Sequence, residues 1–87
     1  KIKKKTVKDN NFSYSIKVAD FYYKETAQMM HSRIKKEASI NNSRIIRLSE
    51  TKYRVLIGPF NDIKSLKDSF EKMNFFNFEN LELLNNV

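Results

Sequence analysis

The chain has 87 residues and a formal net charge of +7, from 17 Lys and Arg against 10 Asp and Glu. This length allows one domain with a thin core, which buries roughly 60–65% of the unfolded surface and excludes a deep enclosed active site. The absence of cysteine excludes disulfides and thiolate metal sites. The positive charge favours an anionic partner, such as nucleic acid, anionic lipid or an acidic glycan. The abundance of lysine, asparagine and isoleucine also fits an AT-rich genome.

Residues 1–12 carry five lysines and show no hydrophobic periodicity, which predicts a flexible basic linker. Because the chain begins with Lys1 and not methionine, we expect residues 13–87 to form one domain of a longer protein. No stretch of the sequence approaches the ~20 apolar residues of a membrane span.

The first predicted strand is Tyr14–Phe21, and it alternates as a half-buried strand does. The alternation assigns one face to Tyr14, Ile16 and Val18, and the opposite face to Ser15, Lys17 and Ala19. Apolar residues at helical spacing then predict an amphipathic helix over residues 24–38.

Two further strands are predicted at 44–48 and 53–57, joined by a hairpin loop over 49–52. The only glycine and the only proline, Gly58 and Pro59, directly follow the second of them and predict its end. Asn61 is the predicted N-cap of a helix over 62–73. A last strand is predicted over 78–84, with Leu81 and Leu83 pointing inward.

The two halves of the chain share one layout, because Tyr53–Phe60 repeats the pattern of Tyr14–Phe21 before a second helix. The resulting order βαββαβ predicts an α+β fold of the ferredoxin-like or RNP-like type. In that fold, a four-stranded antiparallel sheet carries both helices on one face. The other face stays open to solvent, and we expect a domain of this size to bind its ligand there.

No constellation of residues predicts catalysis. His31 is the only histidine, so neither a histidine cluster nor a Ser-His-Asp triad can form within the chain. A single glycine also excludes a glycine-rich phosphate loop. The sequence therefore predicts a binding module that is not an enzyme and uses no cofactor or metal.

On the open face, the alternation places Lys17 beside Arg54 and Leu56 of the third strand. Ser15 lies on the same face, and Arg47 of the second strand is expected to join it. Such a flat, basic and partly apolar surface fits an extended anionic ligand. An ordinary solvated sheet face is the alternative interpretation.

These motifs resemble those of SPOR domains. The first strand of that family reads aromatic-x-Val-Gln-x-Gly-Ser-Phe, which Tyr14–Phe21 follows loosely. Its second half carries Tyr-Arg-Val-x-Val-Gly-Pro-Phe, which Tyr53–Phe60 matches almost letter for letter. The resemblance extends from Tyr14 to about Leu84. Lys17 takes the place of the family's glutamine and Asp20 that of its serine, two positions associated with glycan contact.

The resemblance implies a monomeric peptidoglycan-binding module of the bacterial periplasm or cell envelope. Such domains belong to cell-division proteins and rare-lipoprotein-A-like lytic transglycosylases, and some parents are lipoproteins. They recognise glycan strands stripped of stem peptides by amidases, which are enriched at the division septum. Stripping frees the lactyl carboxylate of each N-acetylmuramic acid, so the strand is anionic. The expected glycan-binding residues are Ser15, Lys17, Asp20, Arg47, Arg54 and Leu56.

Two alternatives stay open. RNA-recognition domains share the βαββαβ order, but they stack bases on aromatic residues of the open face, and Tyr14 and Tyr53 here have inward parity. A protein-interaction module would instead use the sheet or the loop around Phe75 and Phe76.

Overall fold

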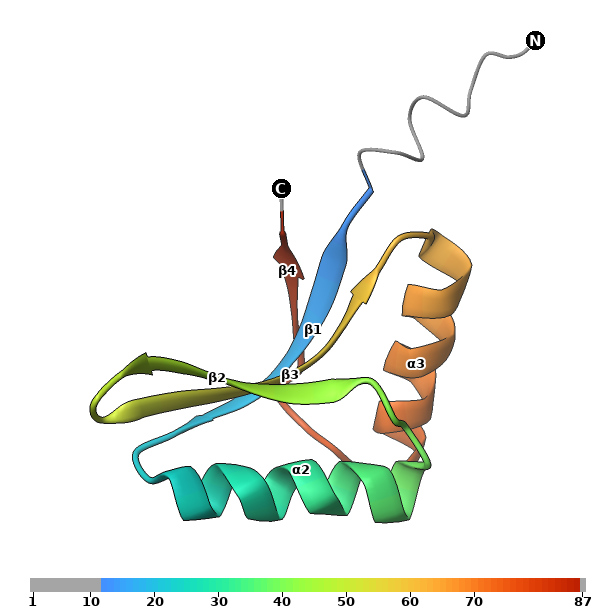
Figure 1. Ribbon diagram of the computed structural model, residues 1–87. Coiled ribbons are helices and arrows are strands. Elements are labelled where there is room, and N and C mark those ends of the chain that lie inside the picture. Colours follow the sequence, from blue (N-terminus) through green and yellow to red (C-terminus); the bar gives the residue numbers. More distant parts are fainter. Residues whose placement is uncertain (1–11, 87) are drawn as a thin grey trace, which may run out of the picture.

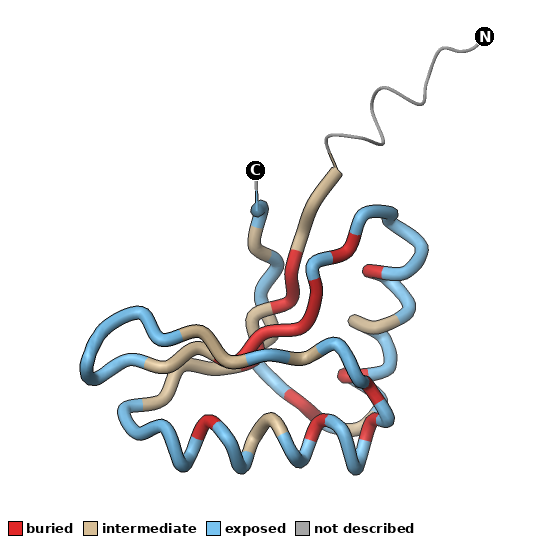
Figure 2. Tube along the Cα trace, in the orientation of Figure 1, coloured by how far each residue is buried: buried red, intermediate tan, exposed pale blue. Residues whose placement is uncertain are grey.

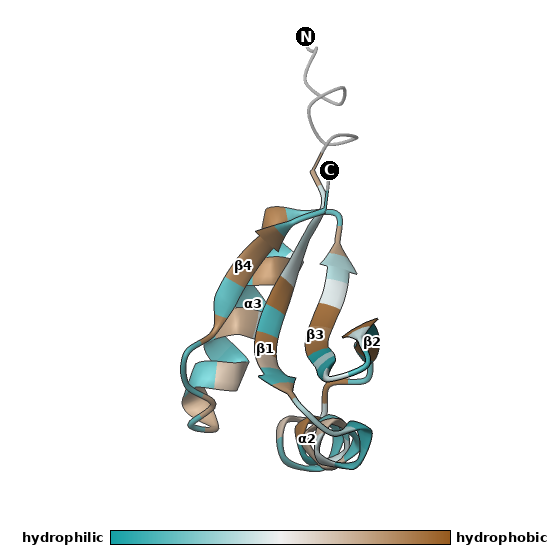
Figure 3. Ribbon diagram, turned by 90° about the vertical axis from the view of Figure 1, so that its left-hand side faces the viewer, coloured by the Kyte–Doolittle hydropathy of each residue, from teal (hydrophilic) through white to brown (hydrophobic). Residues whose placement is uncertain are grey.

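The computed structural model describes residues 12–86, which form a four-stranded antiparallel sheet with two helices on one face (Figure 1). In chain order the elements are β1 (Tyr14–Phe21), α2 (Lys24–Ala38), β2 (Ser43–Ser49), β3 (Lys52–Phe60), α3 (Ile63–Phe75) and β4 (Glu82–Asn85). The strands lie in the order β2-β3-β1-β4, so the two strands with the repeated motif are central (Figure 3). The predicted α+β fold is thus confirmed. No helix in the described part of the chain is long and apolar enough to cross a membrane.

The core lies between the sheet and the two helices (Figure 2). Its fully buried side chains include Ile16 and Ile57 from the central strands, together with Ile34 of α2 and Met73 of α3. Burial of each such side chain stabilises the fold by roughly 1.5–3 kcal/mol. Phe12, which the sequence assigned to the linker, also packs against this core. The remainder of the predicted linker, residues 1–11, lies outside the described residues.

β3 does not end at Gly58-Pro59, and that prediction was wrong. The strand continues to Phe60, which pairs with Tyr14 of β1. A register shift between Tyr14 and Ile16 shows that the dipeptide forms a bulge in the ladder. Gly58 adopts a φ of +130° there, and its N–H donates to the carbonyl oxygen of Asn42 at 3.0 Å. Gly58 therefore allows the strand to continue through the bulge, because the bulge requires a backbone conformation that other residues rarely adopt.

The helix boundaries follow local chemistry. α2 spans the predicted residues, whereas the N-cap of α3 is Asp62 and not Asn61. The Asp62 carboxylate accepts a hydrogen bond from the Ser65 N–H at 2.9 Å, and this bond lowers the pKa of Asp62. His31 Nε2 lies 3.1 Å from the carbonyl oxygen of Ser43, so the single histidine ties α2 to the start of β2.

β4 is shorter than the predicted strand over 78–84. Asn77 and Asn80 have positive φ angles of 68° and 63°, which interrupt the extended backbone before Glu82. Phe78 lies between them and is buried in the core. Leu83 pairs with Ile16 and so shares the helix side, as predicted, but it is 51% exposed because α3 packs mainly on β1 and β3.

Replacement of Gly58 by alanine should destabilise the fold by about 1–3 kcal/mol. A Cβ atom at this position would lie 3.0 Å from Ser15 Oγ and 3.2 Å from the Tyr14 carbonyl oxygen, in addition to the strain of the positive φ. The free energy of unfolding is measured by urea titration with circular dichroism.

Ser39→Gly is the matched control, because Ser39 ends α2 with a φ of 56°. Glycine suits that left-handed position, so this variant should be as stable as the wild type or more stable. A Gly58→Ala protein with wild-type stability would contradict the role given to the bulge.

Candidate binding face of the sheet

The side of the sheet away from both helices is referred to as the open face. The strand pairings place on it the residues Ser15, Lys17 and Asp20 of β1, Lys52, Arg54 and Leu56 of β3, Arg44 and Ile46 of β2, and Glu82 and Leu84 of β4.

A bulge in β1 decides which residues of that strand reach the open face. Lys17 pairs with Leu56, but Ala19 pairs with the adjacent residue Val55, so β1 has one extra residue between them. The extra residue shifts the alternation by one position. Ala19 consequently packs against the core, and the prediction that it points outward was wrong. Asp20 comes to the open face instead, directly opposite Arg54.

Asp20 is the centre of a charge network on this face. Arg54 donates from Nε to Asp20 Oδ1 at 2.8 Å and from Nη2 to Oδ2 at 3.0 Å, which is a bidentate pair. Lys17 Nζ and Lys52 Nζ lie 3.5 Å and 3.8 Å from Asp20 Oδ2. The hydrogen bonds from Arg54 hold the pKa of Asp20 below its ordinary value, and Asp20 in turn raises the pKa of Arg54.

The two central cations expected to meet an anionic ligand are therefore already engaged. The side chains of Lys17 and Arg54 are only 22% and 23% exposed. Lys17 also lies 3.7 Å from Glu82 Oε1. Asp20 and Glu82 together balance both positive charges, so these cations organise the face more than they present free charge.

Ser15 and Leu56 lie on the open face but are covered. Ser15 is fully buried, and its Oγ accepts a hydrogen bond from Asn86 Nδ2 at 2.9 Å. Leu56 is 4% exposed. Both side chains lie beneath the exposed side chains of this face, and neither is accessible to a large ligand without rearrangement.

Arg47 does not lie on the open face. It pairs with Tyr53, whose ring packs against the core, so Arg47 has the parity of the helix side. Its Nε donates to the Ser49 carbonyl oxygen at 3.3 Å. An unbroken ladder from the pair Ser49–Lys52 would have placed Arg47 opposite Arg54, and so on the open face where the sequence predicted it. The register shift between Arg47 and Ser49 moves it to the other side, and the prediction was wrong.

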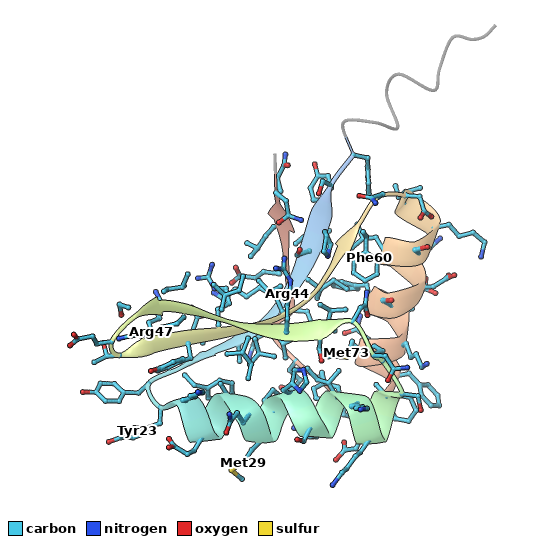
Figure 4. The ribbon with its side chains drawn as sticks, in the orientation of Figure 1. Tyr23, Met29, Arg44, Arg47, Phe60 and Met73 are labelled. Atoms are coloured by element: carbon cyan, nitrogen blue, oxygen red, sulfur yellow. The ribbon has the colours of Figure 1, made fainter. Side chains whose placement is uncertain are left out.

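Arg44 is the residue that the sequence analysis missed. It pairs with Leu56 and extends from β2 on the side away from α2 (Figure 4). Its side chain is exposed and has no hydrogen-bond or ion-pair partner among residues 12–86. The open face as a whole carries four cations (Arg44, Lys17, Lys52 and Arg54) and two carboxylates (Asp20 and Glu82), which leaves two positive charges. Among residues 12–86, Arg44 carries the only guanidinium on the open face that has no partner.

Two exposed tyrosines adjoin the end of β1. Tyr22 and Tyr23 are 61% and 63% exposed, and their ring centroids lie 4.8 Å apart. They follow Asp20 and Phe21 directly, and Tyr23 points outward from the start of α2 (Figure 4). No group of His, Asp or Glu side chains among the described residues is placed to hold a metal ion.

Comparison with protein-family models, with curated proteins and with solved structures finds no match to this chain.

Replacement of Asp20 by asparagine should lower the free energy of unfolding by about 1–2 kcal/mol at pH 7, because Arg54 loses its bidentate partner. The lowered pKa of Asp20 sets the sign of the pH dependence. Its contribution to stability is complete above the unfolded-state pKa, near 3.8, and is lost as the pH falls through the lower folded-state value. The difference between wild type and variant should therefore shrink below about pH 4 in urea titrations.

Asp68→Asn is the matched control, because Asp68 forms only an exposed ion pair with Lys64 at 3.2 Å on one helix face. Its effect should stay below about 0.5 kcal/mol. Equal effects of the two substitutions would argue against an organising role for Asp20.

Proposed function

We propose that the open face binds peptidoglycan glycan strands that lack stem peptides, without catalysis, and that the domain thereby directs a parent envelope protein to the septum. The observation that carries the proposal is the exposed guanidinium of Arg44, which has no partner among residues 12–86 and lies on a sheet face with an excess of two positive charges. The resemblance of Tyr53–Phe60 to the second SPOR motif supplies the class of ligand.

The chemistry of such a strand complements this face. The free lactyl carboxylate of N-acetylmuramic acid matches the planar fork of Arg44, which can hold it with two hydrogen bonds. Lys52 lies four residues from Leu56, the partner of Arg44, and so about 13 Å farther along β3. The two cations can therefore contact different carboxylates of one extended polymer. Each exposed pair contributes about 0.2–1 kcal/mol, so tight binding requires several sugars.

Apolar surface for the sugar rings lies beside these cations. Ile46 is half-buried next to Arg44 on the open face, and it pairs with Arg54. Tyr22 and Tyr23 supply the exposed aromatic rings at the end of β1. With no tryptophan in the chain, sugar stacking depends on these tyrosines.

The placement of the aromatic residues favours a glycan over RNA. The strand aromatics all pack against the core: Tyr14, Phe21, Tyr53 and Phe60. Base recognition on a sheet of this type uses aromatic side chains on the open face. The described strands present cations and aliphatic side chains there instead.

A protein-interaction module is the second candidate, and one observation favours it. Phe75 at the end of α3 is 77% exposed, with its ring 5.0 Å from that of Phe76. The nearby Phe78 is buried and plays no part in such a surface.

Arg44→Gln should weaken binding to amidase-treated sacculi about twofold to fivefold, because it removes one exposed carboxylate pair. Binding is measured as the fraction of purified domain that co-sediments with sacculi, with and without amidase treatment. The pelleted fraction should rise after amidase treatment and fall as salt is added.

Arg47→Gln is the matched control, since it makes the same change in the same strand on the opposite side of the sheet. It should bind as the wild type does. Equal losses in both variants would indicate attraction by net charge alone. Failure of the wild-type domain to pellet with either preparation would refute the proposed ligand.

A further inference from the structure

The short β4 leaves a gap at the edge of the sheet. β4 pairs with β1 only from Tyr14 to Lys17, whereas β1 continues to Phe21. Beyond Lys17, this edge of β1 therefore has no strand partner within residues 12–86. A cleft of about 410 Å³ occupies the gap, bounded by β1, by α2 and by the loop that precedes β4. Its volume falls within the range of small-molecule sites, roughly 300–1,000 Å³.

The cleft has an apolar part and an amide part. Met30 of α2 and Phe78 contribute carbon surface, and the Arg33 guanidinium lies 4.4 Å from the centroid of the Phe78 ring. Asn77 and Asn80 line the loop side, and both are exposed. Their side-chain amides have no hydrogen-bond partner among the described residues. Each amide offers two donors and one acceptor oxygen.

The charges around the cleft differ from those of the open face. Its cations are Lys17 and Arg33, and its carboxylates are Asp20, Glu79 and Glu82. Both cations are already paired, Lys17 with Asp20 and Glu82, and Arg33 with Glu37 at 3.1 Å. Among the described residues, the lining of the cleft therefore offers no unpaired cation to a carboxylate, whereas the open face offers Arg44. A neutral group with an amide and a small apolar end fits both the free asparagine amides and the carbon surface.

We propose that this cleft binds the acetamido group of an amino sugar in the glycan whose carboxylates contact the open face. This inference rests on the proposed function, because Lys17, Asp20 and Glu82 border both surfaces and make them continuous. The acetamido methyl lies against Met30 and Phe78, and its N–H and C=O bond to Asn77 and Asn80. One glycan strand then makes two kinds of contact: its carboxylates bind the cations of the open face, and an acetamido group binds the asparagine amides of the cleft.

The test uses two neutral trisaccharides that separate the cleft from the cationic face. Chitotriose has three acetamido groups and no carboxylate, whereas cellotriose has neither group. Each is titrated into the isotope-labelled domain and followed by NMR. Chitotriose should shift the side-chain amide signals of Asn77 and Asn80 and the methyl signal of Met30, and cellotriose should leave all three unchanged.

A double variant, Asn77→Gly with Asn80→Gly, removes both amides and keeps the backbone, since glycine accepts the positive φ angles of these positions. Its dissociation constant for chitotriose should rise about threefold to tenfold. Asn61→Gly, outside the cleft, should leave the constant unchanged. Arg44→Gln should also leave it unchanged, because chitotriose has no carboxylate.

The absence of shifts at the cleft, equal shifts with cellotriose, or wild-type affinity in the double variant would each overturn the inference. The experiments distinguish failure of the cleft proposal from failure of the peptidoglycan proposal. Denuded sacculi that bind through Arg44 while chitotriose leaves the cleft unperturbed would refute the cleft alone. Chitotriose in the cleft without binding of sacculi would refute the peptidoglycan proposal and the shared glycan, and would leave only an acetamido-binding cleft.

Discussion

The pairing of β1 with β3 is the constraint on which the rest of the structure depends. Two bulges interrupt this central ladder, one at Gly58-Pro59 in β3 and one beyond Lys17 in β1. Because they lie on opposite strands, their shifts cancel. Tyr14 pairs with Phe60 and Phe21 pairs with Tyr53, as an unbroken ladder would have it. Only the pairs in the middle of the ladder, Ile16 with Ile57 and Lys17 with Leu56, are shifted in register by one residue. The core keeps its isoleucines and valines, and the open face acquires Asp20.

The electrostatics of the open face follow from that displacement. Asp20 meets Arg54 because the β1 bulge has turned Ala19 inward, and the bidentate pair then gathers Lys17 and Lys52 around one carboxylate. A carboxylate at this position would oppose an anionic ligand if it were unpaired. Here it is bonded to Arg54 within the sheet, and the positive charge available to a partner shifts outward, to Arg44 on β2 and to Lys52 at the hairpin.

The late start of β4 has a comparable effect at the sheet edge. Two asparagines with left-handed backbone hold the chain away from β1 until Glu82, and Phe78 anchors the intervening loop in the core. The same loop therefore completes the hydrophobic core and opens a polar cleft beside it. A longer β4, as the sequence predicted, would have covered this edge with backbone hydrogen bonds.

The sequence by itself determined the order of the elements, the α+β class, the bounds of β1 and α2 and most of the core. These features depend on periodicity and local propensity, which each segment carries independently of its neighbours. It did not determine on which face of the sheet Ala19 and Arg47 lie. It also did not determine that Ser15 and Leu56 are buried, or that Arg44 is exposed on the open face. Each of these depends on which residues pair across strands, and a bulge of one residue exchanges the two faces of everything beyond it. Only the tertiary structure decides where such a bulge lies, because its energy comes from the packing and hydrogen bonds of two strands distant in the chain.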